Sequence, residues 1–211
     1  DMAADTRTGA ADTATGMDNE IISADCHIDL IWLPPDLFTA NAPAALKDRM
    51  PYVTDGDDGP VWISNGGAFF GLQNGMGSAG RPYVPGVIHR SDRMAEQGLY
   101  DDGKKGIRRL TEPELRIKDQ DLDGVRAEVL YGILGAAERL QDTEAAATMA
   151  SIYNDWLTDF CATHPDRFAG IASILDHDLD AARDEIYRIA ERGVLRGIEV
   201  PLQIDMKPLF H

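Results

Sequence analysis

The stretch IISADCH, residues 21–27, begins the strand and helix pattern that decides the fold of this chain. It is a short apolar segment that ends on a carboxylate and an imidazole two residues apart. In an extended strand, side chains at positions i and i+2 point to the same face. We therefore expect Asp25 and His27 to project together and Cys26 to project the other way. Such a pair can supply two ligands of a divalent cation, although a turn-capping Asp and a core His would leave the same triplet.

A regular alternation of strands and helices follows in the second half of the sequence. Apolar runs predict strands at 127–131, 168–174 and 197–200. The segments between them predict three helices: one that starts with a capping box at 111–114 and stops at Gly124, one that opens at Asp142 or Thr143, and one over 179–190. Alternating strands and helices imply right-handed crossovers and a parallel sheet.

Two other segments carry little regular pattern. Residues 1–16 are rich in Ala, Thr, Asp and Gly, and we expect a disordered leader or one added by cloning, so that residues 17–211 form the domain. Residues 28–110 are irregular and rich in Pro and Gly, and they form an insertion after the first strand. One hairpin is predicted there, with 61–64 and 68–70 flanking 65–67. So long an insertion is often a lid or a wall of a site.

The composition excludes several classes of function. The 211 residues include 36 Asp and Glu against 20 Lys and Arg, and the formal net charge of -16 repels nucleic acids and anionic membrane surfaces. No apolar run approaches the roughly 18 residues that a membrane span needs. Two cysteines, Cys26 and Cys161, are too few for a disulfide scaffold or a Cys-rich zinc site, and we expect a cytoplasmic protein without a signal peptide.

Two motifs in the sequence imitate binding sites without their structural context. Residues 75–80, GMGSAG, match the dinucleotide fingerprint, but Pro82 and Pro85 follow where a phosphate-binding helix would have to start. Residues 119–124, DQDLDG, resemble the start of a calcium loop, but its twelfth position is Leu130 instead of a bidentate Glu. We expect a glycine-rich loop and the solvated end of a helix.

Several short motifs occur in the order of a known family. They are the first strand with its Asp25-Cys26-His27 ending, PPDLF at 34–38, LKDRMP at 46–51, DLDGV at 121–125, EVLY at 128–131, YNDWL at 153–157 and HPDRF at 164–168. In this set the chain resembles the amidohydrolase-2 family of TIM-barrel metal-dependent hydrolases and decarboxylases, which includes aminocarboxymuconate-semialdehyde decarboxylase and resorcylate-type decarboxylases. The resemblance runs from about residue 20 to residue 211.

The resemblance implies a (β/α)8 barrel of which the chain holds about four strands and three helices. It implies that Asp25 and His27 are first-strand metal ligands, and that the metal is Zn²⁺, with Mn²⁺ as the alternative. The remaining family ligands follow strands five, six and eight, so we expect them in a C-terminal half beyond residue 211, in the same or another polypeptide. The expected reaction is hydrolysis or non-oxidative decarboxylation of a small carboxylated, aromatic or ring-derived substrate, with catalytic residues unassigned in this half.

Two other hypotheses remain open at the level of sequence. The chain could be a half-barrel fragment or assembly subunit without activity of its own, because an open four-stranded sheet exposes two edge strands that must be paired or covered. Its partner would then be the C-terminal half of the enzyme or further copies of this chain. A nucleotide-binding α/β domain that uses residues 75–80 is the third hypothesis, and the two prolines argue against it.

Overall fold

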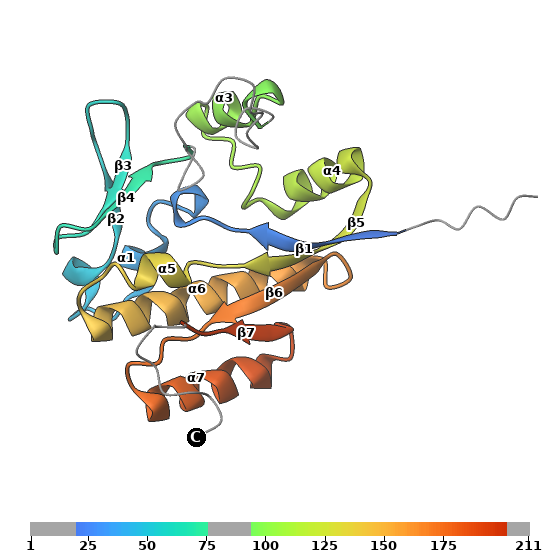
Figure 1. Cartoon of the computed structure of the whole chain (residues 1–211). Helices are drawn as coiled ribbons and strands as arrows, with labels where there is room; N and C mark the ends of the chain where they lie inside the picture. The colour runs from blue at the N-terminus through green and yellow to red at the C-terminus, as the bar shows by residue number, and fades with distance from the viewer. Residues whose placement is uncertain (1–19, 76–93, 202–211) are drawn as a thin grey trace, which may run out of the picture.

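A four-stranded parallel sheet forms the centre of the molecule in the computed structural model, which describes residues 20–75 and 94–201 (Figure 1). Its strands lie in the order β1, β5, β6, β7, and each neighbouring pair is parallel. They span Ile21–His27, Val125–Tyr131, Phe168–Ser173 and Gly197–Glu199. The predicted strands, their order and their parallel pairing are therefore confirmed.

Helices connect these strands and cover one face of the sheet. The three helices that the sequence predicts are α4, Pro113–Asp123, α6, Thr143–Thr163, and α7, Leu179–Arg192. Shorter elements are η1, Leu30–Trp32, α1, Leu37–Asn41, η2, Lys47–Arg49, α3, Leu99–Lys104, and α5, Leu134–Ala137. Among the described residues, no helix combines the length and the hydropathy that crossing a membrane requires.

Helix α6 lies behind β6 in Figure 1 and supplies most of the helix-to-sheet core. Asp142 caps its start by accepting a hydrogen bond from the Ala145 amide at 3.1 Å, as the sequence predicts. Tyr153 and Leu157 face the sheet and are fully buried. Phe160 continues the row onto Phe168 of β6, with ring centroids 4.8 Å apart. This apolar stripe fixes the helix against the strand.

Helix α4 begins differently from the prediction. Its N-cap is Glu112, whose side chain makes no capping hydrogen bond, and Pro113 occupies the first turn. The hydroxyl of Thr111 instead donates to the carbonyl of Trp32 at 2.7 Å, so the predicted capping box is wrong. A hydrogen bond to a distant part of the chain therefore orients the Thr111 side chain, and the helix starts after Glu112 without a side-chain cap. The helix ends at Gly124 in the left-handed conformation, with a φ of 69°, as expected.

The insertion folds into a separate three-stranded antiparallel sheet at the carboxyl edge of the barrel strands (Figure 1). The predicted hairpin is present as β3, Val61–Ile63, and β4, Phe69–Leu72. Strand β2, Tyr52–Thr54, pairs with β3 and was not predicted. Trp62 is fully buried and meets Phe38 edge-on, with ring centroids 6.0 Å apart. Apart from Gly75, the fingerprint at 75–80 lies outside the described residues.

An arginine clamp ties the insertion to the start of α6. The Arg49 guanidinium donates to both carboxylate oxygens of Asp142, with Nε at 2.6 Å from Oδ2, and to Glu144 at 2.8 Å. Hydrogen bonds from Arg49 hold the pKa of the Asp142 carboxyl below its usual value. The fork of an arginine against a carboxylate fixes orientation as well as distance, so the clamp sets how the insertion lies on the barrel.

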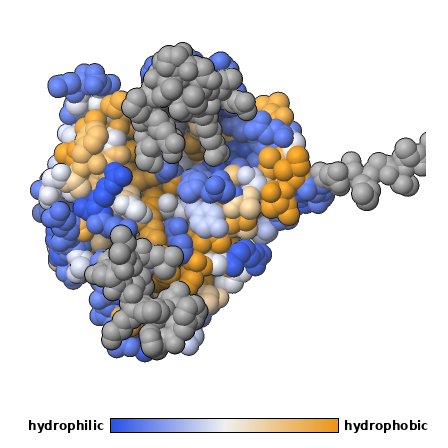
Figure 2. Space-filling view, in the orientation of Figure 1, coloured by the Kyte–Doolittle hydropathy of each residue, from blue (hydrophilic) through white to orange (hydrophobic). Residues whose placement is uncertain are grey.

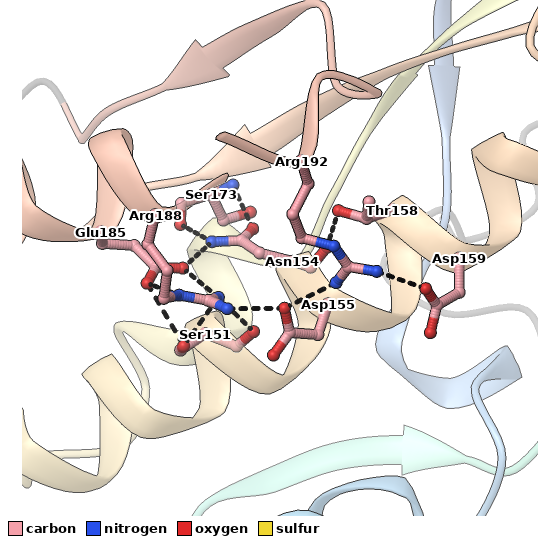
Figure 3. A network of polar contacts seen from close by, with 9 residues as sticks. All are labelled: Ser151, Asn154, Asp155, Thr158, Asp159, Ser173, Glu185, Arg188 and Arg192. Carbon is pink, nitrogen blue, oxygen red and sulfur yellow. Dashed lines mark hydrogen bonds and ion pairs between the residues drawn. The ribbon is translucent and has the colours of Figure 1, made fainter. Parts of the chain in front are cut away.

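A second polar network joins α7 to α6 (Figure 3). Arg188 of α7 donates to Asp155 of α6 at 2.7 Å, and Arg192 donates to the same carboxylate at 2.9 Å. Asn154 lies at the buried end of the network. Its amide donates to the Ser173 carbonyl at 3.1 Å and accepts from the Ser173 amide at 2.9 Å. The network therefore runs from the surface to the carboxyl end of β6.

Among residues 20–75 and 94–201, the other face of the sheet is only partly covered, and we call it the open face. Leu130 and Ala172 are fully buried against the helices, so their neighbours Val129 and Ile171 point to the open face and are only partly buried. Both edge strands also expose large apolar side chains, Ile21 and Ile22 on β1 and Ile198 on β7. In Figure 2, orange surface marks the start of β1 where the chain leaves the grey N-terminal segment. The architecture is a TIM-barrel-type half, as the resemblance implies.

Candidate active site

The carboxyl end of β1 places Asp25 and His27 on the open face of the sheet. The side chains of Asp25 and His27 are 89% and 53% exposed, and Asp25 Oδ1 lies 3.0 Å from His27 Nε2. The imidazole also lies beside the ring of Tyr131 from β5, at a centroid distance of 5.8 Å. The predicted common direction of the two side chains is confirmed. The same alternation turns Cys26 to the helix-covered face, where it is buried.

Cys26 takes part in a buried polar cluster behind the strand. Its sulfur lies 3.0 Å from Ser23 Oγ, and its thiol donates to Glu128 Oε1 at 3.3 Å. Burial raises the pKa of Cys26, and the nearby Glu128 charge acts in the same direction. Because the thiolate is the reactive form of cysteine, this protonated and buried thiol is unsuited to nucleophilic chemistry.

A buried ion pair anchors the strand end that carries His27. Arg116 of α4, whose side chain is 7% exposed, donates to Glu128 Oε2 at 2.6 Å. Burial alone would raise the pKa of Glu128, but the charge and hydrogen bond of Arg116 outweigh it and lower that pKa. The same guanidinium approaches the His27 carbonyl at 3.4 Å and bonds the Leu110 carbonyl at 2.9 Å. Arg116 thus holds β1, β5 and the insertion end together beneath His27.

A pocket of about 220 Å³ opens beside His27 at the carboxyl edge of the sheet. Barrel residues after β1 and β5 form one side, and Phe70 of the inserted sheet forms part of another. Ile31 and Ile133 contribute apolar surface to the pocket. Arg139, which follows α5 in the sequence, also lines it. Ligand pockets in proteins combine such apolar walls with a few polar groups, and drug-sized ones measure about 300–1,000 Å³. This pocket has room for a smaller molecule.

Glu199 at the end of β7 is a site residue that the sequence analysis did not single out. Its Oε1 accepts a hydrogen bond from the Ser173 hydroxyl at 2.6 Å and from the Gly132 amide at 3.3 Å. It therefore links the carboxyl ends of β5, β6 and β7 next to the pocket that Gly132 lines. The signal that could have found it is its place at the end of a predicted barrel strand, where functional residues gather.

Asp25 and His27 lie side by side at the end of β1. The 3.0 Å contact between Asp25 Oδ1 and His27 Nε2 is a hydrogen bond between two side chains of the types that ligate metals. In residues 20–75 and 94–201, however, no group of three or more His, Cys, Asp or Glu side chains could hold a metal ion. The described part of the chain therefore brings together two side chains of metal-ligating type and no third one beside them.

Comparison with known proteins finds partial sequence similarity to decarboxylases. No family profile matches the chain. The chain is 33% identical over 116 residues to gamma-resorcylate decarboxylase of Rhodococcus jostii (strain RHA1). The aligned residues make up 54% of this chain and 35% of that protein. It is 33% identical over 75 residues to gamma-resorcylate decarboxylase of Rhizobium sp. (strain MTP-10005), covering 36% of this chain and 23% of that protein.

A solved structure supports the fold. The crystal structure of an amidohydrolase from Mycobacterium avium subsp. paratuberculosis K-10 matches with a TM-score of 0.58 and 17% identity, over 84% of this chain and 50% of that chain. The half-barrel fold and the resemblance to the amidohydrolase-2 family are confirmed by these matches. The chain spans half or less of the length of each of these three proteins.

Proposed function

We propose that this chain forms the part of a metal-dependent decarboxylase or hydrolase that holds the first-strand metal ligands and one side of the substrate pocket. The observation that carries the proposal is the Asp25 and His27 pair, which is exposed at the carboxyl end of β1, where His27 also lines the pocket. In TIM-barrel enzymes the active site lies at this edge of the sheet. The match to gamma-resorcylate decarboxylases adds support for decarboxylation of an aromatic carboxylate.

Within this chain, each group has a role that its surroundings support. Asp25 and His27 would hold two positions of a Zn²⁺ or Mn²⁺ ion, and Arg116 fixes the backbone that carries His27. When bound, such a cation supplies Lewis-acid polarisation of a substrate oxygen or lowers the pKa of a water. Apolar residues of the pocket, Ile31, Phe70 and Ile133, would pack on a ring and exclude water from it. The remaining ligands would come from a C-terminal half of the barrel.

Metal content and turnover test this proposal together. In the full-length protein, His27→Ala and Asp25→Asn should each reduce bound metal from about one equivalent to a small fraction and abolish release of CO₂ from gamma-resorcylate. His164→Ala is the matched control, because His164 precedes β6 at the opposite edge of the sheet. Full metal content and turnover in His27→Ala would refute the assignment of a metal ligand.

A second candidate function is assembly without activity. It is favoured by the exposed apolar side chains on both edge strands, Ile21 and Ile22 on β1 and Ile198 on β7. In that case residues 17–211 alone would form stable oligomers that contain no metal. Substoichiometric metal bound in the interface between chains would instead favour the enzyme.

A further inference from the structure

We infer that Glu199 is a positioning residue, whose carboxylate holds the pocket-lining end of β5 in place through the backbone of Gly132. This inference rests on the proposed function, because it takes the pocket beside His27 as the substrate site. It deepens that proposal by naming what fixes one wall of the site. Three observations carry it: the point at which the β5–β6 pairing ends, the two hydrogen bonds of the carboxylate and the buried support behind it.

The backbone at the end of β5 continues past its pairing with β6. The last paired residues of the two strands are Leu130 and Gly170, and Gly132 follows two positions later. There the Gly132 amide donates to Glu199 Oε1 at 3.3 Å, although β7 lies two strands away from β5 in the sheet. A side chain therefore supplies the acceptor that a neighbouring strand would otherwise offer.

The segment that follows this amide forms one wall of the pocket. The lining residues in it are Gly132, Ile133, Gly135 and Ala136. Ile133 is the N-cap of α5, and its carbonyl accepts hydrogen bonds from the helix, so the backbone just before it sets where α5 begins. In the part of the chain that the structure describes, Glu199 is not a lining residue itself. It can therefore act on a ligand only through this backbone.

The carboxylate of Glu199 is itself held in a fixed place. Its Oε1 also accepts from the Ser173 hydroxyl at 2.6 Å, which is the short distance expected for a hydroxyl that donates to a charged oxygen. The backbone carbonyl of Glu199 accepts from the Ile174 amide at 2.9 Å. Among the described residues, a hydroxyl and an amide orient this carboxylate, and no ion pair with a cationic side chain does.

Ser173 is anchored in turn on the helix-covered side of the sheet (Figure 3). Asn154 donates to its carbonyl and accepts from its amide, and both residues are fully buried. The Asn154 amide also donates to Glu185 of α7 at 2.9 Å. The buried ring of Tyr153 packs against Gly132, where a side chain would not fit. Gly132 is thus fixed between a packed ring and an acceptor whose own support reaches two helices.

Two substitutions separate the reach of the Glu199 side chain from its charge. Glu199→Gln keeps the length and an oxygen acceptor but removes the charge, whereas Glu199→Asp keeps the charge and shortens the side chain by a methylene. In the full-length, metal-loaded enzyme, Glu199→Asp should raise the KM for gamma-resorcylate about tenfold and leave kcat within about twofold, because a displaced wall weakens binding of substrate and transition state alike. Glu199→Gln should keep KM within about threefold of the wild type.

Hydrogen exchange measures the same displacement without turnover. In Glu199→Asp, amide exchange over residues 131–137 should become at least about threefold faster than in the wild type, because the hydrogen bond that protects this segment is lost. Exchange in β6 should not change, and Glu199→Gln should exchange as the wild type does. Glu191→Asp is the matched control, because it makes the same change at an exposed position of α7. It should match the wild type in both measurements.

Three outcomes would overturn the inference. Loss of metal or of kcat in Glu199→Gln, with Glu199→Asp nearer to the wild type, would show that the charge acts directly. Unchanged KM and unchanged exchange in Glu199→Asp would show that no backbone segment depends on the reach of this side chain. Faster exchange with an unchanged KM would assign Glu199 to stability alone.

Failure of the proposed function gives a different pattern. A wild type that neither holds metal nor turns over gamma-resorcylate would refute the metal-dependent decarboxylase, and exchange over residues 131–137 would then decide the inference alone. Faster exchange in Glu199→Asp, restored in Glu199→Gln, would support the positioning role, and equal exchange would refute it. Normal turnover, with wild-type KM and exchange in Glu199→Asp, would retain the proposed function and refute the positioning role.

Discussion

At the scale of single residues, the backbone of Gly132, which lines the pocket, lies too close to Tyr153 to carry a side chain. Gly132 directly follows β5, and its amide donates to Glu199. A Cβ atom built there would lie 2.3 Å from Tyr153 Cε1 and 2.8 Å from the hydroxyl oxygen, which is far inside contact distance. Because Tyr153 is fully buried in the core, its ring cannot move aside.

Gly132→Ala should therefore destabilise the fold. We expect the free energy of unfolding to fall by about 1–3 kcal/mol, the usual cost of overpacking a core, measured by urea denaturation. Gly135→Ala is the control, because nothing lies within 4 Å of its Cβ position and the residue sits in α5. It should be neutral or slightly stabilising, and equal losses in the two variants would contradict the proposed contact.

Tyr153 offers a second test at this scale. Its hydroxyl is buried and has no hydrogen-bond partner among the described residues. Burial raises the pKa of this phenol well above its usual value, and the nearby Glu199 charge adds to the shift. Tyr153→Phe removes an unsatisfied polar atom while keeping the ring, so we expect stability to be unchanged or raised by up to about 1 kcal/mol. A loss above 1 kcal/mol would reveal a partner for the hydroxyl.

At the scale of elements, the polar network around α6 contains a buried part that joins it to β6 and a more exposed part that joins it to α7, and the energies of the two should differ. Asn154→Ala leaves the Ser173 amide and carbonyl without their partner inside the core. Unsatisfied buried groups cost about 1–3 kcal/mol each, and we expect a total loss of about 2–4 kcal/mol in denaturant unfolding. Asp155→Ala removes partly exposed ion pairs of Arg188 and Arg192, and we expect at most about 1 kcal/mol. The reverse order would show that the salt bridges dominate (Figure 3).

The Arg49 clamp should make the docking of the insertion sensitive to acid. Since Arg49 lowers the pKa of Asp142 in the folded state, the stabilisation is complete above the ordinary aspartate pKa of about 3.9 and is lost as the pH falls through the lower folded value. Asp142→Asn keeps a capping side chain and removes the charge. We expect a smaller fall in its unfolding midpoint between pH 7 and pH 3 than in the wild type. Asp36→Asn, at an exposed site, should follow the wild type.

The elements that sequence could predict are those with a strong local pattern. Helix α6 carries its own cap at Asp142 and a continuous apolar stripe, and its start was predicted within a residue. The three residues of β2 have no such pattern, because that strand exists through its pairing with β3. Thr111 is not the cap because its hydrogen bond to the Trp32 carbonyl, 79 positions earlier in the chain, orients its side chain, and Glu112 takes the N-cap position.

In the candidate site, likewise, sequence could predict only the features that depend on residues close together in the chain. Alternation along β1 placed Asp25 and His27 on one face, since that depends on residues two apart. The contributions of Arg139, Phe70 and Glu199 depend on elements that meet only in the folded chain. No local pattern could reveal them, although each follows or belongs to a strand near the carboxyl edge of the sheet.

At the scale of the whole molecule, the open face of the sheet limits what residues 17–211 can do alone. Val129 and Ile171 on the open face are only partly covered, and the edges of β1 and β7 are unpaired in the described chain. We expect this piece to associate in solution, to bind Zn²⁺ or Mn²⁺ weakly and to turn over no substrate, because two protein ligands are fewer than the three that catalytic zinc sites usually have.

Light scattering and metal analysis of residues 17–211 check this expectation. The double variant Ile22→Lys and Ile198→Lys places charges on the two exposed edges and should shift the mass toward the monomer. Asp36→Asn again serves as a control, because Asp36 is exposed and lies outside both edge strands. A metal-loaded, active monomer of the unsubstituted piece would contradict both the half-barrel architecture and the need for further ligands.

Phe70 reaches the pocket from a sheet that, in the part of the chain that the structure describes, shares no hydrogen-bonded ladder with the barrel strands. Substitutions there change the wall against which a ligand packs, while β1, β5, β6 and β7 keep every one of their pairings. Substitutions in the insertion can therefore change which ligands fit the pocket with little effect on the stability of the barrel strands, as substitutions in antibody loops change binding without altering the framework. Among related proteins that share this half-barrel, sequence divergence at the position of Phe70 should follow substrate choice, and divergence at Leu130 should not.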